Sequence, residues 1–233
     1  MKFHEWKDLL TEWAKTGEHR GKVNYARKVI ETALKKYNKP YVAFSGGKDS
    51  TCVLALVLEQ KPDVMVLNWD YGEYFMPREF QNEIIENARK MGAVNIRVET
   101  SKKYEELKDQ AENVLGEEYL GKLIKKLKKK EGYDLAFTGL RAEEAVKRKL
   151  KTKKFFYEEN GMMNCAPIRN WTWKDVWAFI FSNNIPYHSH YERYADVEGL
   201  QNVRLCTFFD SEFDKFGRSN IDGVILWKKR GAG

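Results

Sequence analysis

The chain has 233 residues, of which 42% are hydrophobic and 32% are charged, and its formal net charge is +7. This length suits one α/β domain with additions, and the 14% of aromatic residues excludes an intrinsically disordered chain. No run of 18 apolar residues is present, so we expect no membrane contact, and the first ten residues lack the apolar core of a signal peptide. Three widely spaced cysteines, Cys52, Cys165 and Cys206, disfavour a disulfide framework and a four-cysteine metal site, so we expect a cytoplasmic protein.

Helices are predicted at the start of the chain. Apolar residues recur at helical spacing between residues 3 and 37, and Thr16-Gly17 and Gly21 divide this stretch into two helices. After Pro40, short apolar runs alternate with amphipathic segments. The predicted strands are 41–44, 64–69, 94–98 and 135–138, and the predicted helices are 49–59, 77–91, 103–129, 141–149 and 173–181. A hairpin is predicted from 155–157 and 162–165 with its turn at Asn160-Gly161, and an irregular tail follows Tyr187.

This alternation predicts an α/β fold with a doubly wound, mostly parallel sheet and helices on both faces. We expect a helical extension at 1–38, the α/β domain at 39–190, and a tail at 191–233 that packs on or near the site. Ligands of such sheets bind beyond the carboxyl ends of the strands, so functional residues are expected directly after strands.

A glycine-rich loop, Ser45-Gly46-Gly47-Lys48-Asp49-Ser50, follows the first predicted strand and opens a helix. The two glycines allow a tight turn, and the start of the helix presents unpaired N–H groups to an anion. Two serine hydroxyls and the Lys48 ammonium group add donors, so the loop is suited to bind phosphate or pyrophosphate, while Asp49 can cap backbone donors or hold a metal. It is not a Walker loop, which requires a glycine where this chain has Val42 and Ser or Thr where it has Asp49.

The hexad resembles the S-G-G-x-D-S pyrophosphate loop of the adenine-nucleotide α-hydrolase superfamily, also called the PP-loop ATP pyrophosphatases. The resemblance implies a doubly wound fold that binds ATP or a related adenylate and acts at or near its α-phosphate. It also implies that residues 45–50 bind the nucleotide, with Lys48 and Asp49 in catalytic roles.

Three further stretches resemble the phosphoadenosine-phosphosulfate (PAPS) reductase branch, which includes the small subunit of ATP sulfurylase and archaeal sulfotransferase-like proteins. Residues 69–79 resemble D-T-G-x-x-F-P-E-T, which implies that Asp70 and Gly72 lie near the nucleoside. Residues 138–148 resemble G-x-R-x-x-E-S-x-x-R, which implies nucleotide binding by Gly139 and anion contacts by Arg141 and Arg148, with surface ion pairs as the alternative. Residues 165–177 resemble P-I-x-x-W-T-x-x-D-V-W, which identifies the branch rather than the chemistry.

The chain departs from the reductases of this branch in its cysteines. Residues 207–233 contain none, so the catalytic E-C-G-x-H motif is missing, and the paired cysteines of iron–sulfur members are missing as well. We therefore expect no iron–sulfur cluster and no thioredoxin-linked reduction. Cys206 is the candidate nucleophile and Cys165 its alternative, and the other interpretation of each is a small buried side chain.

His188 and His190 form a His-x-His pair. We expect a loop histidine that contacts the nucleotide or its substrate rather than a zinc site, because few further ligands lie nearby in the sequence. No metal-ligating residue is therefore assigned.

Two substrates remain open. With ATP, an acceptor oxygen would attack the α-phosphate and pyrophosphate would leave; with PAPS, the sulfonyl group would move to a thiol or hydroxyl. The hexad with Lys48 and Asp49 is closer to members that use ATP, whereas the later motifs are closer to members that use PAPS. We favour a sulfotransferase-like enzyme of unknown acceptor, in which Lys48, the loop N–H groups and Mg²⁺ stabilise the transition state.

The positive charge is concentrated between Lys122 and Lys154, a segment with 13 Lys and Arg residues and only 4 Asp and Glu residues. This segment is either a solvated lysine-rich helix or a surface for an anionic partner such as tRNA, whose bases some PP-loop enzymes activate with ATP. A third hypothesis is a non-catalytic nucleotide-binding subunit. The aromatic N-terminal helices, with Trp6 and Trp13, serve either as a homodimer face or as packing against the sheet.

Overall fold

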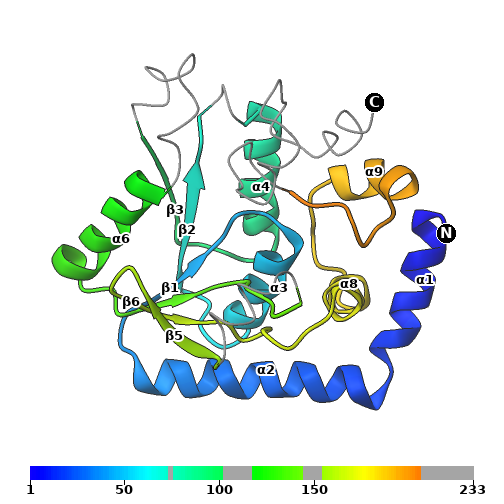
Figure 1. Ribbon diagram of the computed structural model, residues 1–233, viewed down its shortest axis with the longest axis horizontal. Helices are drawn as coiled ribbons and strands as arrows, with labels where there is room; N and C mark the ends of the chain where they lie inside the picture. The colour runs from blue at the N-terminus through cyan, green and yellow to red at the C-terminus, as the bar shows by residue number, and fades with distance from the viewer. Residues whose placement is uncertain (73–75, 102–116, 144–153, 206–233) are drawn as a thin grey trace.

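A six-stranded sheet organises the computed structural model, which describes residues 1–72, 76–101, 117–143 and 154–205 (Figure 1). The strands are β1 (Pro40–Ala43), β2 (Met65–Asp70), β3 (Ile96–Thr100), β4 (Leu135–Phe137), β5 (Phe156–Glu159) and β6 (Met162–Cys165). Their order across the sheet is β3-β2-β1-β4-β6-β5, and every neighbouring pair is parallel except β5 and β6. The predicted α/β fold with a mostly parallel, doubly wound sheet is confirmed.

Helices cover both faces of this sheet. They are α1 (Phe3–Ala14), α2 (Gly17–Lys36), α3 (Lys48–Leu58), α4 (Arg78–Lys90), α6 (Glu117–Glu131), α8 (Trp173–Ser182) and α9 (His190–Glu198). Because strand side chains alternate between faces, Val42 joins the core formed with α2, α3, α4 and α8, whereas Tyr41 packs with Leu123 and Leu127 of α6. Among the described helices, none combines the length and apolar character needed to cross a membrane.

The local signals of the sequence agree with most elements. Asn160 and Gly161 both have positive φ, 51° and 73°, and join β5 to β6 in the two-residue hairpin that was predicted. Gly21, predicted to separate two helices, instead lies inside α2, where packing of the apolar helix face outweighs the roughly 1 kcal/mol cost of a helical glycine. Strand β3 begins two residues later than the predicted strand 94–98.

The largest error concerns the chain beyond Tyr187, which was predicted to be irregular but contains α9. This helix has no strong amphipathic pattern. It is held by tertiary contacts, since the Tyr191 ring lies edge-on to Trp177 of α8 with ring centroids 4.9 Å apart. Glu83 of α4 accepts hydrogen bonds from the backbone and hydroxyl of Ser189 at 2.5 and 2.8 Å, which fixes the start of the helix.

A buried carboxylate joins the N-terminal helices to α8. Asp175 is fully buried and accepts hydrogen bonds from Trp13 Nε1 at 3.0 Å, Lys22 Nζ at 2.8 Å and the backbone of Thr172 at 2.8 Å. Burial by itself would raise the pKa of Asp175, but hydrogen bonds from His19, Lys22 and these other donors hold that pKa well below its ordinary value. The ionised carboxylate is therefore part of the folded state.

We expect Asp175→Asn to lower the free energy of unfolding at pH 7 by about 3 kcal/mol, because it leaves Lys22 without its buried counter-charge. A depressed pKa in the folded state gives stability that is present above the pKa of the unfolded carboxyl and is lost as pH falls. The wild-type free energy of unfolding should therefore fall between about pH 5 and pH 2 more steeply than that of the variant. Denaturant titrations across this range measure both slopes. Asp8→Asn, on the exposed side of α1, is the control, and equal slopes for wild type and Asp175→Asn would contradict the assignment.

Candidate functional site

The loop of residues 45–50 lies at the carboxyl edge of the sheet, where the strand order reverses. β1 pairs with β2 on one side and with β4 on the other, so the chain leaves β1 in the crevice between two diverging halves of the sheet. This is the position at which open α/β sheets bind ligands. Gly139, which follows β4, borders the same crevice; a Cβ there would lie 2.7 Å from the backbone nitrogen of Ser50, so only glycine allows β4 and α3 to approach so closely.

The conformation of the loop depends on Gly46. Its φ is +76°, a left-handed conformation that side chains disfavour, and a Cβ there would lie 2.5 Å from Cγ1 of Ile84 on α4. Gly47 follows as the N-cap residue of α3, so the first N–H groups of that helix have no partner within the helix. Glycine therefore serves two purposes here, a backbone turn at position 46 and access to the helix end at position 47.

The hydroxyl groups of the loop surround this helix end. Ser45 Oγ lies 3.2 Å from Ser50 Oγ and accepts a long hydrogen bond of 3.4 Å from the backbone of Gly47. The hydroxyl of Tyr191, from α9, accepts a hydrogen bond of 2.9 Å from the backbone N–H of Lys48 and one of 3.4 Å from that of Leu205. The hydroxyls of Ser45, Ser50 and Tyr191 therefore lie together at the start of α3. Tyr191 links this point to α9 and Leu205, in the C-terminal part of the chain.

Two cations and a carboxylate lie under the loop. Asp49 accepts hydrogen bonds from Lys48 Nζ at 3.1 Å and from Arg141 Nε at 2.7 Å, and both cationic side chains are only 4% exposed. Burial by itself would raise the pKa of Asp49, but the charges of Lys48 and Arg141 hold it below its ordinary value. These three groups lie at the start of α3, where the helix dipole is positive.

Arg141 extends this network away from the loop. It donates to Glu143 at 2.5 Å, and Glu143 in turn accepts a hydrogen bond of 2.7 Å from the backbone of Trp173, the first residue of α8. Arg141 is not among the residues that line the pocket described next. In this structure it therefore holds Asp49 and α8, and direct contact with an anion stays a prediction.

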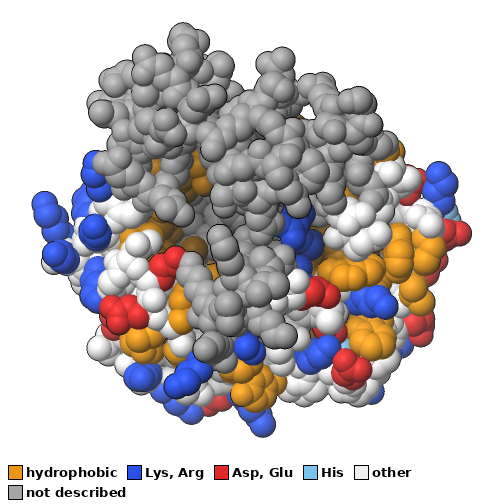
Figure 2. Space-filling model, viewed as in Figure 1, with side chains coloured by type: hydrophobic (Ala, Val, Ile, Leu, Met, Phe, Trp, Pro, Cys, Tyr) orange, Lys and Arg blue, Asp and Glu red, His pale blue; other side chains and the backbone are white. Residues whose placement is uncertain are grey.

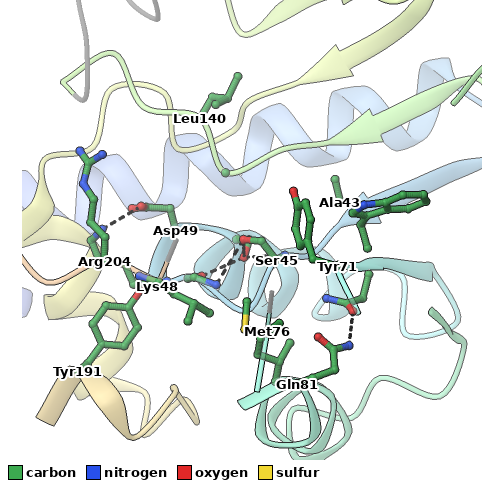
Figure 3. A pocket seen from close by; sticks show the side chains of 17 residues that line it. Ala43, Ser45, Lys48, Asp49, Tyr71, Met76, Gln81, Leu140, Tyr191 and Arg204 are labelled. Atoms are coloured by element: carbon green, nitrogen blue, oxygen red, sulfur yellow. Dashed lines mark hydrogen bonds and ion pairs between the residues drawn. The ribbon is translucent and has the colours of Figure 1, made fainter. Parts of the chain in front are cut away.

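A pocket of about 290 Å³ opens above the loop (Figure 3). Its walls come from the ends of β1, β2 and β4, the first turn of α3, helix α4, Tyr191 and residues 204–205. Figure 3 shows Lys48 and Asp49 near Arg204 and Tyr191 on one side, with Tyr71 and Ala43 on the other. The pocket thus joins a charged end at the loop to an aromatic and apolar end beside β2.

The predicted nucleoside motif lies at the end of β2. Asp70 accepts two hydrogen bonds from Arg78, at 2.7 and 2.9 Å, and one of 2.8 Å from the backbone of Gly72. Burial by itself would raise the pKa of Asp70, but Arg78 holds it below its ordinary value. Neither Asp70 nor Gly72 lines the pocket, whereas their neighbours Trp69 and Tyr71 do. Nucleotide contact by Asp70 and Gly72 therefore stays a prediction.

Other predicted site residues lie outside the pocket or outside the described residues. Arg148 and Cys206 belong to stretches that the structure does not describe. Cys52 and Cys165 are fully buried, and burial raises the pKa of both thiols well above the ordinary value, so neither is a reactive thiolate.

The histidine pair packs against α4 rather than lining the pocket. His188 and His190 share a hydrogen bond of 2.8 Å between their Nδ1 atoms, and His188 stacks on Phe80. Burial and the neighbouring His188 lower the pKa of His190 to about 2, so its ring is neutral. His190 packs against the ring of Tyr191, and neither histidine lines the described pocket, so the expected contact with a nucleotide stays a prediction.

The lysine-rich end of α6 lies near the amino end of β1, whereas the residue 45–50 loop follows the carboxyl end of that strand. Lys39, which precedes β1, donates to the carbonyl of Glu131 at the end of α6 at 2.7 Å. The length of β1, about 17 Å to Ser45, therefore separates the end of α6 from the loop. Figure 2 shows Lys and Arg side chains gathered along the edge where Figure 1 places α6, and residues 125, 126 and 128–130 are exposed. None of these lysines lines the pocket.

Comparison with known proteins identifies the family. A family model described as the phosphoadenosine phosphosulfate reductase domain matches residues 39–217. The chain belongs to this family. The predicted recognition of the PAPS reductase branch is thereby confirmed, and α1 and α2 precede the residues that the model matches.

Relatives of the PAPS reductase domain are distant. An uncharacterized protein of Methanocaldococcus jannaschii is 30% identical over 222 residues, which are 88% of this chain and 44% of that protein. An adenosine 5′-phosphosulfate reductase of Geobacillus is 26% identical over 186 residues, 75% of this chain and 77% of that protein. The solved structure of the U34-tRNA thiolase NcsA of Methanococcus maripaludis, with its 4Fe–4S cluster, superposes with a TM-score of 0.55 at 15% identity, over 73% of this chain and 64% of that chain.

The cofactor expectation, a nucleotide with Mg²⁺ and no iron–sulfur cluster, needs correction. NcsA has this fold and carries a 4Fe–4S cluster, so the expected exclusion of a cluster is wrong. Among the described residues no group of three or more His, Cys, Asp or Glu could hold a metal ion, but Cys206 is not among them. The missing paired-cysteine motif therefore does not decide whether this chain holds a cluster.

The sequence signals missed four residues that line the pocket: Asn68, Gln81, Tyr191 and Arg204. A usable signal existed for Asn68, because an amide inside the apolar strand 64–69 is unusual. Tyr191 and Arg204 lie in the part of the chain predicted to be irregular, and Gln81 lies among many polar residues of α4. Their roles depend on tertiary packing that no local pattern encodes.

We expect Gly46→Ala to distort the loop, because a Cβ would combine a φ of +76° with contact to Ile84. The expected cost is about 1–3 kcal/mol in the free energy of unfolding and loss of nucleotide affinity. Gly17→Ala is the matched control, because nothing lies within 4 Å of a Cβ there. Thermal unfolding and nucleotide titration measure both effects, and wild-type behaviour of Gly46→Ala would contradict the described loop.

Proposed function

We propose that this chain is an enzyme that binds an adenine nucleotide, PAPS or ATP, and transfers a group from the anhydride of that nucleotide to an acceptor. The observation that carries the proposal is the pocket at the switch point of the sheet, which has the residue 45–50 loop and the first turn of α3 as its charged end. Membership of the PAPS reductase domain family and similarity to an adenosine 5′-phosphosulfate reductase support the same ligand class.

The charge arrangement supports an anionic ligand. Asp49 and Glu143 together balance the charges of Lys48 and Arg141, so the attraction for an anion comes from the N–H groups and the positive dipole end of the first turn of α3, with Lys48 Nζ as a charged donor. A phosphate or phosphosulfate group placed there would meet donors that are already oriented, so little reorganisation is needed as charge develops during transfer. Asp49 keeps both cations in position.

Two reactions are compatible with such a site. With PAPS, the bond between the sulfonyl sulfur and the phosphate oxygen breaks, the sulfonyl group passes to a thiol or hydroxyl, and adenosine 3′,5′-bisphosphate leaves. With ATP, an acceptor oxygen forms a bond to the α-phosphorus and pyrophosphate leaves. The family match over residues 39–217 favours the PAPS reaction, and because residues 207–233 contain no cysteine we propose transfer of the sulfonyl group rather than its reduction.

Calorimetric titration of the full chain with PAPS and with ATP tests the proposal. We expect at least one of them to bind, and we expect Lys48→Met to weaken that binding at least tenfold by removing a charge-assisted contact. Lys61→Met, on the turn after α3, is the control and should bind like wild type. Failure of both nucleotides to bind would contradict the proposal, whereas binding without any turnover would favour a non-catalytic subunit.

The exposed lysines of α6 favour a second candidate function, ATP-dependent modification of tRNA. NcsA, which has a similar fold, is a tRNA thiolase. The expected result is a tRNA shift whose affinity falls steeply with salt and is lost when lysines 125, 126 and 128–130 are replaced by serine. Binding unaffected by these replacements would exclude α6 as an RNA surface.

A further inference from the structure

Two buried amide side chains form part of the pocket wall. Asn68 on β2 is 1% exposed, and Gln81 on α4 is 5% exposed, yet both line the pocket. Buried amides require hydrogen-bond partners, so the orientation of each one can be derived from its neighbours. Neither residue was assigned a role by the sequence motifs.

A backbone carbonyl fixes the orientation of both amides. Asn68 Nδ2 lies 2.9 Å from the carbonyl oxygen of Phe44, which can only accept, so this atom of Asn68 must be the NH₂ group. Asn68 Oδ1 then faces Gln81, and the atom of Gln81 that lies 2.7 Å away must be Nε2, donating to it. The chain of bonds from Phe44 thus leaves Gln81 Oε1 pointing away from Asn68.

Gln81 Oε1 accepts no hydrogen bond from the described part of the chain. None of the described residues donates to it, and it is not among the atoms sealed from solvent. Figure 3 shows Gln81 beside Met76, with Ser45 and Tyr71 above it, and the amide oxygen on the side of Met76. The pocket therefore presents one oriented acceptor on an otherwise buried side chain, where water or a donor group of a ligand can satisfy it.

The surroundings of this acceptor suit a flat ring. Met76 and Ile84 are buried side chains of the same wall, and Trp69 and Tyr71 add aromatic surface. The charged end of the pocket, at residues 45–50, is already suited to the acid groups of a nucleotide. An acceptor among apolar and aromatic side chains fits the exocyclic amino group of a nucleobase.

We propose that Gln81 is a specificity-determining residue whose Oε1 accepts a hydrogen bond from the amino group of the nucleotide's base. The inference rests on the proposed function, because it takes a nucleotide as the ligand. A base with an oxygen at the same position would place two acceptors against each other and leave Gln81 Oε1 unsatisfied. The protein should therefore prefer a 6-amino purine to a 6-oxo purine by at least about tenfold.

The experiment compares ATP with ITP, in which the 6-amino group is replaced by a carbonyl and N1 gains a hydrogen, by calorimetric titration of the full chain. Wild type should bind ATP at least about tenfold more tightly, and Gln81→Met should bring the two affinities close together, mainly by weakening ATP. Gln60→Met is the matched control, because Gln60 donates to the carbonyl of Arg27 and does not line the pocket. This control should keep the wild-type preference.

A second variant separates recognition from folding. Gln81→Glu retains an acceptor oxygen at nearly the same position and, as a protonated acid, still donates to Asn68 Oδ1, so at a pH below the pKa of that acid it should keep a preference for ATP over ITP that Gln81→Met loses. Thermal unfolding of each variant verifies that it is folded. This pair keeps the test valid even where one substitution lowers stability.

The outcomes distinguish this inference from the proposed function. Equal binding of ATP and ITP by wild type, or an unchanged preference in Gln81→Met, would overturn the role of Gln81 while leaving nucleotide binding in place. A loss with 2′-deoxy-ATP or 3′-deoxy-ATP that Gln81→Met abolishes would assign Gln81 to the ribose and overturn base recognition. Binding of neither nucleotide to wild type would contradict the proposed function itself.

Discussion

The close approach of backbone to backbone at the start of α3 is the constraint on which the rest of the site depends. Gly139 lets the end of β4 lie against Ser50, and Gly46 lets the chain turn under Ile84, so that the first N–H groups of α3 face the crevice between β1 and β4. A side chain at either glycine would push the helix end away from the sheet. Geometry of the main chain, rather than any one side chain, therefore creates the proposed anion site.

Ion pairs and hydrogen bonds connect the start of α3 to helices elsewhere in the molecule. Asp49 binds Lys48 and Arg141, and Arg141 reaches the first residue of α8 through Glu143. The same helix α8 holds Asp175, which anchors the two N-terminal helices. Tyr191 connects the opposite side, because its hydroxyl bridges the backbone of Lys48 and the residue 204–205 segment. Elements from the N-terminal helices to residue 205 are thus linked, directly or through α8, to the start of one helix.

Sequence patterns predicted the sheet, the loop and the hairpin because each has a local cause: apolar alternation, glycine spacing and an Asn-Gly turn. They did not predict α9, because its formation depends on Trp177 and Glu83 rather than on its own residues. They named Arg141, whose anion contact stays a prediction, but did not predict its hydrogen bonds to Asp49 and Glu143, because a motif names a residue without its partner. Gln81 was missed for the same reason, since its orientation follows from a carbonyl on a different strand.

A crystal structure of the full chain with a bound adenine nucleotide, PAPS or ATP, tests the central claim most directly. The account predicts that an acid group of the nucleotide lies within hydrogen-bond distance of the backbone N–H groups at residues 47–50, with the base directed toward β2 and α4. A nucleotide bound at another edge of the sheet, or a residue 45–50 loop that makes no contact with the anion, would contradict it.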